Sequence, residues 1–316
     1  MELYPGVHQI SSLFGGRNLF QYLFVGEQMT VLLDSGVAST PEDVIFPYME
    51  RIGLQPRQLT LAITMHADLD HQGGNAALRA ASRHTLLACH REDRVLIEDP
   101  EALYRLRMDH LCAECGVHAP EEVKPLAGRA TPVDVAFSGG ETLRLGPGWE
   151  LKVWHVPGHS DGHLTIYDEK HQAAFTSDAV HGRGNPGATG EMAFSPTYYT
   201  VDAYLSTIQF LESMPIEHLF SGHWPNAHGV QVGAFLRESR LFVEEMDQVL
   251  PLCLDRHPRG ASLGELIEDL APRMGSWPRE ANWLFMWAVY GHLTRQEQTG
   301  KVKRIEASHP VRWKRG

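Results

Sequence analysis

The sequence predicts an α/β fold followed by a mainly helical part at the carboxyl end. Short apolar segments rich in β-branched residues alternate with segments of helical periodicity up to about residue 225. Beyond Gly229 the apolar residues recur at helical spacing instead. The alternation indicates two sheets, or one large sheet, with helical layers outside. We therefore expect one domain over residues 1–229 and a small, mainly helical domain or lid over residues 230–316.

The first part is expected to build its sheets from short strands. Residues 20–25 and 29–34 predict two strands joined by a turn, and Pro41 marks the start of a helix, where proline is tolerated. Residues 59–63 are apolar and partly β-branched, which predicts a buried strand. Further strands are expected at 85–89, 150–156, 163–168, 172–178 and 218–222, and further helices at 75–83 and 201–214.

Helices are also expected in an insertion and in the carboxyl-terminal part. The insertion at 100–132 predicts a helix over residues 102–115, lying over one end of the main domain. Ser262 and Glu265 form the S-x-x-E pattern of a capping box, which marks the start of a helix. Residues 283–293 predict a strongly apolar helix, and a glycine stop and a strand-like end follow it.

The composition is that of an ordinary globular protein. The 316 residues are 43% hydrophobic, and no apolar run approaches the ~18–20 residues that a membrane helix needs. The start, MELYPGVHQI, lacks the basic and apolar regions of a secretory signal, and four unevenly placed cysteines do not form a disulfide pattern. We therefore expect a reduced, cytoplasmic setting without membrane contact.

The charge pattern argues against tight, nonspecific binding to nucleic acid. The formal net charge is −11, whereas phosphate contacts need clustered Lys and Arg. Residues 301–316 are the local exception, because their basic residues are Lys301, Lys303, Arg304, Arg312, Lys314 and Arg315 and their only acidic residue is Glu306. We expect a solvated tail here rather than a nucleic-acid contact.

Residues 63–74, ITMHADLDHQGG, carry four potential metal ligands within six positions. His66, Asp68, Asp70 and His71 follow a predicted buried strand and precede a predicted helix. On such a turn alternate side chains can converge on one point. The same residue types also serve as capping and solubilising groups on surface turns, so the quartet alone leaves both a metal site and a surface turn open.

Three further potential ligands follow predicted strands. His159 lies in the glycine-bounded turn VPGHSDGH, Asp178 ends the segment FTSD, and His223 ends the segment LFSGH. A buried metal site built from loops draws its ligands from such strand ends. The sequence as a whole therefore favours a metal site over a surface turn.

Taken together, these motifs resemble the metallo-β-lactamase superfamily. The H-x-D-x-D-H quartet, PGHS, a strand-terminal SD and a strand-terminal SGH occur in the family's order, and Asp34 of LLDSG matches an early structural aspartate. The resemblance covers roughly residues 5–225. It implies an αββα sandwich with a two-metal site at one edge of the sheets. It also implies one metal on His66, Asp68 and His159, another on Asp70, His71 and His223, and Asp178 bridging both.

Asp68 departs from the family pattern H-x-H-x-D-H, which has a histidine at this position. The exchange replaces a neutral imidazole by a carboxylate, so the implied ligands are four histidines and three aspartates. Oxygen ligands favour harder ions, and iron or manganese therefore becomes plausible beside zinc for the two divalent ions. The alternative is that Asp68 points away and leaves its metal position weak or empty. Acidic residues occur here in relatives such as the flavodiiron proteins, which carry Glu.

A second, weaker metal signal lies in the insertion. Its candidate residues are His110, Cys112, Cys115 and His118. They have C-x-x-C spacing with flanking histidines, which occurs in structural zinc sites. A lone C-x-x-C on a predicted helix, without a second pair, more often has no metal.

Several aromatic residues and histidines are candidates for a substrate pocket. Tyr198, Tyr199 and Trp224 fall on loops next to the expected metal site, and His181 lies close to Asp178 in sequence. We expect these four to contact substrate. The alternative for the three aromatic residues is that they pack beneath the helical lid, and for His181 that it is an exposed histidine or one satisfied within the core. His163 is a further candidate beside the site.

The leading hypothesis is a metal-dependent hydrolase that cleaves an ester, lactone or thioester of a small molecule. Two neighbouring divalent ions lower the pKa of a bridging water, so hydroxide is available at neutral pH. Asp70 is the candidate proton carrier to the leaving group. The sequence contains no G-x-S-x-G motif and no Cys–His nucleophile signature.

Two alternatives come from other classes of protein. Residues 292–305, HLTRQEQTGKVKRI, resemble the winged-helix tail of a lactamase-like endoribonuclease group, which suggests a phosphodiesterase or endoribonuclease. The net charge of −11 opposes that hypothesis. The acidic Asp68 suggests redox chemistry at a di-iron centre, but the chain is too short for an appended flavodoxin domain.

Overall fold

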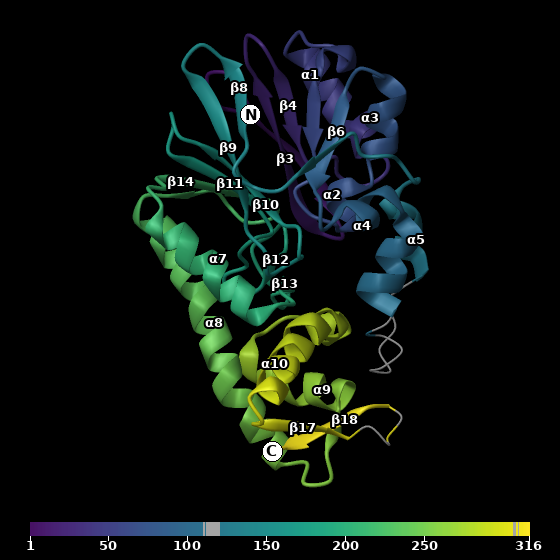
Figure 1. The fold of residues 1–316 in the computed structure, drawn as a ribbon, viewed down its shortest axis with the longest axis vertical. Coiled ribbons are helices and arrows are strands. Elements are labelled where there is room, and N and C mark those ends of the chain that lie inside the picture. The colour runs from purple at the N-terminus through teal and green to yellow at the C-terminus, as the bar shows by residue number, and fades with distance from the viewer. Residues whose placement is uncertain (110, 112–120, 306–307, 309) are drawn as a thin grey trace.

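Two β-sheets form the upper part of the molecule in Figure 1. This computed structural model describes residues 1–316 except 110, 112–120, 306–307 and 309. The first sheet has seven strands in chain order, which are β1 (Glu2–Tyr4), β2 (Val7–Phe14), β3 (Arg17–Val25), β4 (Thr30–Leu33), β5 (Leu61–Ile63), β6 (Leu86–His90) and β7 (Val135–Phe137). Pairing is antiparallel from β1 to β4 and parallel from β4 to β7.

The second sheet has six strands, of which β11 and β14 pair in parallel and the others pair antiparallel. Its order is β15 (Ala227–His228), β14 (His218–Ser221), β11 (Ala173–Ser177), β10 (Leu164–Asp168), β9 (Trp149–His155) and β8 (Thr142–Gly146). Every strand expected before residue 229 occurs. A short hairpin of β12 (Asn185–Pro186) and β13 (Met192–Phe194) was not expected.

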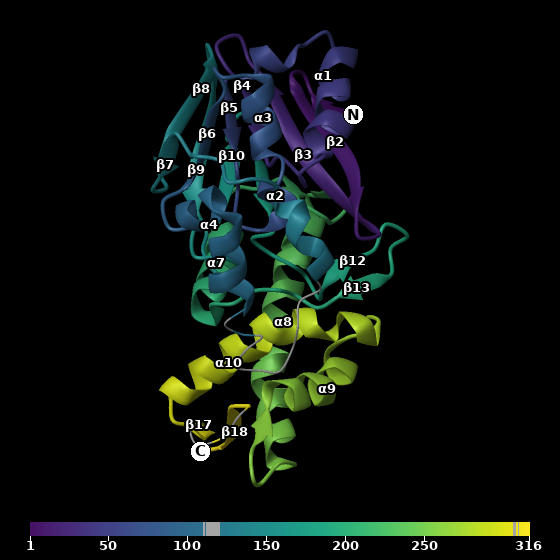
Figure 2. The same ribbon diagram turned by 90° about the vertical axis from the view of Figure 1, so that its right-hand side faces the viewer.

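Alternating residues of β4 separate two apolar cores. Val31 and Leu33 belong to the core between the two sheets, whereas Leu32 belongs to the core beneath the outer helices. The helical elements on that outer face are η1 (Pro41–Ile45), α1 (Phe46–Arg51) and α3 (Asn75–Ala81), as Figure 2 shows. On the second sheet, Leu219 packs in a third core with residues of α7 (Val201–Ser213). The layers are therefore helix, sheet, sheet, helix, as expected.

The carboxyl-terminal part consists of helices and a small sheet. Its elements are α8 (Val230–Asp255), β16 (Ala261–Ser262), α9 (Leu263–Met274), η5 (Arg279–Phe285), α10 (Met286–Gln298), β17 (Val302–Ile305) and β18 (Arg312–Arg315). The expected capping box is present, because Ser262 Oγ accepts from Glu265 N and Glu265 Oε2 accepts from Ser262 N. The order helix, strand, helix, helix, strand, strand is that of a winged helix.

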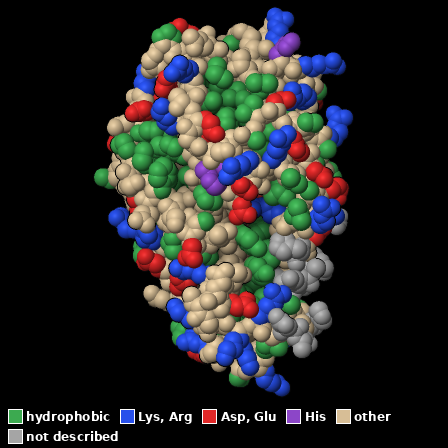
Figure 3. Space-filling view, in the orientation of Figure 1, with side chains coloured by type: hydrophobic (Ala, Val, Ile, Leu, Met, Phe, Trp, Pro, Cys, Tyr) green, Lys and Arg blue, Asp and Glu red, His purple; other side chains and the backbone are tan. Residues whose placement is uncertain are grey.

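The described residues of 301–316 do not form a solvated tail, and that expectation was wrong for them. β17 and β18 pair with each other, and β18 also pairs with β16. Val302 and Trp313 are each only 1% exposed, because they pack in the core of the carboxyl-terminal part. Lys303 and Lys314, which pair across β17 and β18, are exposed on the opposite face, and basic side chains are visible at the lower end of the molecule in Figure 3.

The carboxyl-terminal part shares a continuous apolar core with the sandwich. One cluster contains Tyr104, Ile208 and Leu219 of the sandwich together with Phe242 and Trp313. In Figure 1, α8 begins beside α7 and runs to the far end of the molecule, where it packs on β18. The chain passes from sheet to helix at residue 229, but independent folding of residues 230–316 stays a prediction.

The helix expected over residues 102–115 is present as far as the structure describes it, because helical residues run without a gap from Pro100 to Asp109. They form α5 (Pro100–Leu103) and the π-helical η3 (Tyr104–Asp109); α4 (Arg94–Glu98) precedes the insertion, and the 3₁₀ η4 (Glu121–Ala127) lies further along it. Asp99 caps α5 by accepting from Glu101 N. The weaker zinc candidates His110, Cys112, Cys115 and His118 lie outside the described residues. Among the residues that are described, no helix is long and apolar enough to cross a membrane.

Candidate metal centre

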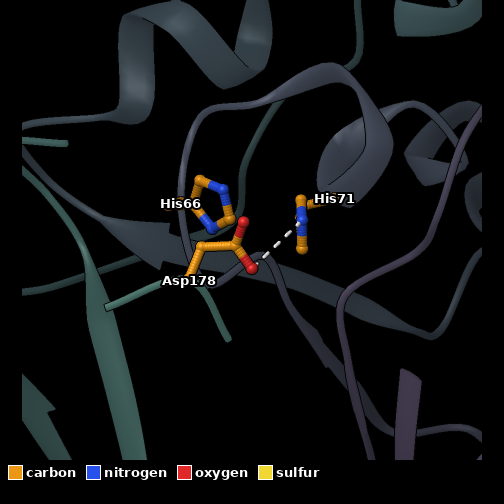
Figure 4. A group of neighbouring side chains, drawn as sticks. All are labelled: His66, His71 and Asp178. Carbon is orange, nitrogen blue, oxygen red and sulfur yellow. Dashed lines mark ion pairs between the residues drawn. The ribbon is translucent and has the colours of Figure 1, made fainter. Parts of the chain in front are cut away.

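The seven predicted metal ligands come from four loops that follow strands. β5 leads into α2 (Leu69–Gln72) through His66, Asp68, Asp70 and His71, whereas His159 follows β9, Asp178 follows β11 and His223 follows β14. Their ligand atoms form three groups, and the atoms of each group lie within 4.8 Å of one another. The groups are His66, Asp68 and His159 (the first position), Asp70, His71 and His223 (the second position), and His66, His71 and Asp178. Figure 4 shows the third group, which joins the two positions.

Two glycines allow α2 to lie close to the loop after β4. A Cβ on Gly73 would lie 2.2 Å from the carbonyl oxygen of Leu126, and a Cβ on Gly74 would lie 2.3 Å from that of Ser35. Ser35 N donates to the carbonyl oxygen of His71 at 2.8 Å. A larger residue at either glycine would therefore push α2 and its ligands away from β4.

Asp34, just after β4, orients His71. Its Oδ2 lies 2.8 Å from His71 Nδ1. The same carboxylate accepts from Met65 N through Oδ1 and from Ser177 Oγ through Oδ2, each at 2.8 Å. Because a carboxylate only accepts, Nδ1 carries the proton and Nε2 faces the centre. Burial opposes a positive charge on His71, but nearby carboxylates, Asp34 foremost, raise its pKa to about 10. The ring therefore lies where a cation is strongly favoured.

At the first position, Asp68 lies between two histidines. Its Oδ2 is 2.9 Å from His159 Nε2 and 3.5 Å from His66 Nε2. The other ring nitrogen of His159 lies 3.4 Å from Thr197 Oγ1, which leaves Nε2 directed at the first position. Burial, foremost, and the neighbouring His71 hold the pKa of His66 well below its usual range. His66 is therefore a neutral imidazole, the form that binds metals.

At the second position, two imidazole nitrogens and a carboxylate oxygen face one another. His71 Nε2 and His223 Nε2 are 3.3 Å apart, and His223 Nε2 is 3.4 Å from Asp70 Oδ2. His223 Nδ1 lies 2.7 Å from the carbonyl oxygen of Asn18 and must donate to it, so Nε2 has a free lone pair. Asp178 stands beside both rings, with Oδ1 3.8 Å from His71 Nε2 and Oδ2 3.5 Å from His223 Nε2.

The donor set fits divalent metal ions. Both ring nitrogens of His66 and Oδ1 of Asp178 are buried and have no hydrogen-bond partner among the described residues. A buried polar atom without a partner costs about 1–3 kcal/mol, so several of them in one place need a compensating ligand. Histidine nitrogens held by carboxylate or carbonyl groups on the opposite ring atom are typical of metal ligands.

A cavity of about 380 Å³ lies directly over these ligands. Asp68, Asp70, Asp178 and His223 form its floor. The charged Arg17, Arg107 and Glu280 also line it, and the larger apolar side chains of its wall are Phe14, Leu69, Met108, Phe194, Trp283, Leu284 and Trp287. These side chains come from the β2–β3 turn, α2, η3, the β12–β13 hairpin and the η5–α10 segment. Four separated parts of the sandwich and the carboxyl-terminal part thus enclose the centre together.

The four residues expected to contact substrate lie elsewhere. Tyr198 is fully buried, and its hydroxyl lies 2.8 Å from His292 Nε2. Trp224 donates its Nε1–H to a backbone carbonyl oxygen, and its ring packs edge-on against the buried His181. Tyr199 lines a neighbouring cavity of about 240 Å³. None of these four side chains lines the cavity over the ligands, so their contact with substrate stays a prediction.

Two arginines contact the predicted metal ligands, and the sequence analysis missed both. Arg107 of η3 pairs with Asp68, and Arg17 at the start of β3 pairs with Asp70. Burial opposes ionisation of Asp68, but Arg107 and His159 hold the pKa of this carboxyl well below its usual range. Neither arginine stands in a motif, and each is far from its aspartate in sequence, so no local signal marks them.

The αββα layers place histidine and aspartate groups that could hold a metal ion at one edge of the sheets. A family model for the metallo-beta-lactamase superfamily matches residues 15–223. The chain therefore belongs to the metallo-beta-lactamase superfamily.

Several known proteins are similar to this chain. Acyl-coenzyme A thioesterase MBLAC2 of Gallus gallus is 26% identical over 246 residues, which is 69% of this chain and 78% of that protein. Its counterpart from Homo sapiens is 24% identical over 256 residues, covering 73% and 82% respectively. Among solved structures, a metallo-beta-lactamase family protein from Thermus thermophilus has a TM-score of 0.79 at 19% identity and covers 99% of this chain and 100% of its own. That likeness extends through the carboxyl-terminal part and concerns the fold alone.

Proposed function

We propose that the protein is a binuclear metal-dependent hydrolase for an ester, lactone or thioester of a small molecule with an apolar acyl group. The cavity is the observation that carries this proposal. Its floor consists of predicted metal ligands, and its wall is mainly aromatic and aliphatic. A substrate that places an apolar group against this wall brings its adjacent carbonyl group to the floor.

In this proposal the side chains have different roles, which follow from where each one lies. The first and second positions would each hold one divalent ion, and Asp178 beside both would supply a further carboxylate ligand. Bound ions supply the usual chemistry of such centres, which is to lower the pKa of water and to polarise a carbonyl oxygen. Asp70 lies on the cavity floor, so it is the residue placed to pass a proton to the departing group.

Within this class a thioester has the best support. Two relatives that align with 69% and 73% of this chain are named acyl-coenzyme A thioesterases. An acyl chain of such a substrate suits the apolar wall that includes Trp283, Leu284 and Trp287. Which metal is native, among zinc, iron and manganese, is part of the test below.

The nuclease alternative has less support from the structure. A nuclease that used the basic residues after residue 300 would need them near the metal ligands. Those residues lie on β17 and β18, and among the described residues none after Trp287 lines the cavity. No observed feature favours the di-iron redox alternative.

The proposal is tested with purified protein loaded separately with zinc, iron or manganese. Acyl thioesters, aryl esters, lactones, bis(p-nitrophenyl) phosphate and a short RNA are offered at equal concentration. We expect carbonyl substrates to be cleaved, with thioesters first, and the phosphodiesters to be left intact. Cleavage of the phosphodiesters alone would overturn the proposal.

A substitution in the cavity wall tests the role of the cavity separately from that of the predicted metal ligands. Ala281 lines the cavity and is only partly buried, so Ala281→Trp fills space without touching a ligand. We expect kcat/KM for long-chain thioesters to fall at least roughly tenfold, because the acyl group loses its apolar contacts. Metal content should not change. Equal loss for short and long acyl groups would argue against binding of the chain in this cavity.

A further inference from the structure

Arg107 makes four polar contacts at the first position. Its Nε lies 2.6 Å from Asp68 Oδ1, and its Nη2 lies 3.3 Å from Asp68 Oδ2. Nη2 is also 3.3 Å from His159 Nε2, and Nη1 donates to the carbonyl oxygen of His159 at 3.1 Å. The guanidinium therefore contacts two of the three ligands of this position. Its side chain is only 10% exposed, so water screens this charge poorly.

The contacts of Arg107 balance the charge that distinguishes this chain from its family pattern. Asp68 places a carboxylate where the pattern has a neutral imidazole, which adds one negative charge to a buried site. Arginine is always protonated in proteins, so Arg107 adds one positive charge at bidentate distance from the same carboxylate. The pair has the net charge of the histidine that it would replace.

The position of Arg107 is fixed by groups outside the pair. Trp287 of α10 donates its Nε1–H to the carbonyl oxygen of Arg107 at 3.1 Å. Asp93, which is buried, attracts the guanidinium and is itself held by Ser160 Oγ at 2.6 Å and by Gly162 N at 2.8 Å. The insertion and the carboxyl-terminal part therefore both help to hold the arginine at the first position.

We propose that Asp68 and Arg107 act as one neutral ligand unit, in which Arg107 sets the charge and thereby the metal affinity of the first position. This inference rests on the proposed metal centre. According to this inference the insertion supplies the positive charge that compensates Asp68. The role of Asp68 as a ligand then depends on a residue 39 positions away in the sequence. The carboxylate and the guanidinium must therefore be exchanged together.

The proposal predicts opposite effects for the two single substitutions. In Asp68→His the imidazole is the family's ligand, but Arg107 remains as a buried cation that has lost its bidentate carboxylate partner beside a divalent ion. Affinity at the first position should therefore fall roughly tenfold or more. In Arg107→Met the carboxylate loses its counter-charge, so the same position attracts a cation more strongly and binds it roughly tenfold more tightly. The double variant Asp68→His/Arg107→Met should return to near the wild-type affinity.

The experiment measures zinc binding by competition with a chromophoric chelator and counts bound ions by elemental analysis. Cobalt(II) absorption reports the coordination of each bound ion independently of turnover. Circular dichroism and thermal unfolding establish that each variant is folded, and Arg107→Gln replaces Arg107→Met if the latter is not. Arg107→Lys keeps the charge but loses the fork, so it should bind zinc as the wild type does.

Arg17 provides a matched control within the same centre. It is also 10% exposed and pairs with a ligand aspartate, but it contacts Asp70 through Nη2 alone at 3.3 Å. Asp68→His/Arg17→Met removes an equal positive charge, but from the second position instead of the first. It should recover much less of the first-position affinity than Asp68→His/Arg107→Met does.

The outcomes separate this inference from the proposed function. Rescue of Asp68→His by Arg107→Met, and not by Arg17→Met, supports the neutral unit. If the wild type binds two ions and Asp68→His binds them equally well with Arg107 present, the inference is wrong and the proposed function stands. Weaker zinc binding by both Arg107→Met and Arg107→Lys would also overturn it, since the arginine would then only orient Asp68. A wild type that binds no divalent ion would overturn the proposed function and this inference with it.

Discussion

The two metal positions differ in how much of the molecule each one uses. The groups that orient the histidines of the second position come from the sandwich, because Asp34 and the carbonyl oxygen of Asn18 hold them and both follow or belong to strands of the first sheet. The first position also uses Arg107 of the insertion, which Trp287 of α10 holds in turn. The carboxyl-terminal part therefore influences the metal centre through the first position. Substitutions in that part should change metal binding at the two positions unequally.

The largest effect is expected where the two positions meet. His71→Ala together with Asp178→Ala removes a predicted ligand of the second position and the carboxylate that we propose both positions share. We expect elemental analysis to find most of the bound metal gone. His84→Ala with Asp43→Ala removes the same residue types from exposed sites and should leave the content unchanged. Equal metal content in the two double variants would refute the ligand assignment.

A smaller and one-sided effect is expected from Trp287→Phe. The ring is kept, but the Nε1–H that donates to the carbonyl oxygen of Arg107 is lost. Losing a hydrogen bond of about 1 kcal/mol should change zinc affinity about fivefold at the first position only. Stepwise zinc titration measures this, with Trp283→Phe as the control because it lines the same cavity. An equal change in zinc affinity at the second position would contradict the proposed difference between the two positions.

Tyr198→Phe tests whether the buried link between the two parts of the molecule serves stability. The hydroxyl of Tyr198 lies 2.8 Å from His292 Nε2, whose Nδ1 lies 2.8 Å from Asp247 Oδ1. Losing it should lower the free energy of unfolding by about 1–2 kcal/mol, measured by urea denaturation. The KM should stay the same. A raised KM with unchanged stability would instead support the earlier expectation that Tyr198 contacts substrate.

No effect on carbonyl hydrolysis is expected from charge reversal at the far end of the molecule. Deleting residues from Lys301 onward would remove the buried Trp313, so substitution is the cleaner change. Lys303 and Lys314 are exposed and paired across β17 and β18. Lys303→Glu with Lys314→Glu should leave thioester turnover as it is, measured at two salt concentrations. Salt-sensitive RNA cleavage that this variant loses would favour a nuclease.

The sandwich and the ligand candidates could be predicted from the sequence, because short stretches of consecutive residues carry the signal for both. The strands are short apolar runs, and His66 to His71 occupy six consecutive positions after one of them. The π-helical part of the insertion was not predictable, since no residue pattern marks the change from α5 to η3. Arg107 reaches Asp68 only through that part of the fold, so no spacing rule could have paired them.

The cavity wall escaped prediction for the same physical reason. Phe14, Phe194 and Trp283 come from distant segments whose packing brings them together. The aromatic residues chosen instead lie near ligands in sequence, but Tyr198 and Trp224 turn into the core, where their polar atoms have protein partners. Proximity in sequence to a ligand therefore predicted burial near the centre rather than exposure to its cavity.

The most direct test of the metal centre is anomalous diffraction from crystals grown with zinc, recorded on both sides of the zinc absorption edge. We predict two peaks, one among His66, Asp68 and His159 and the other among Asp70, His71 and His223, with Asp178 between them. A single peak, or peaks away from these seven side chains, would contradict a binuclear centre at this edge of the sheets.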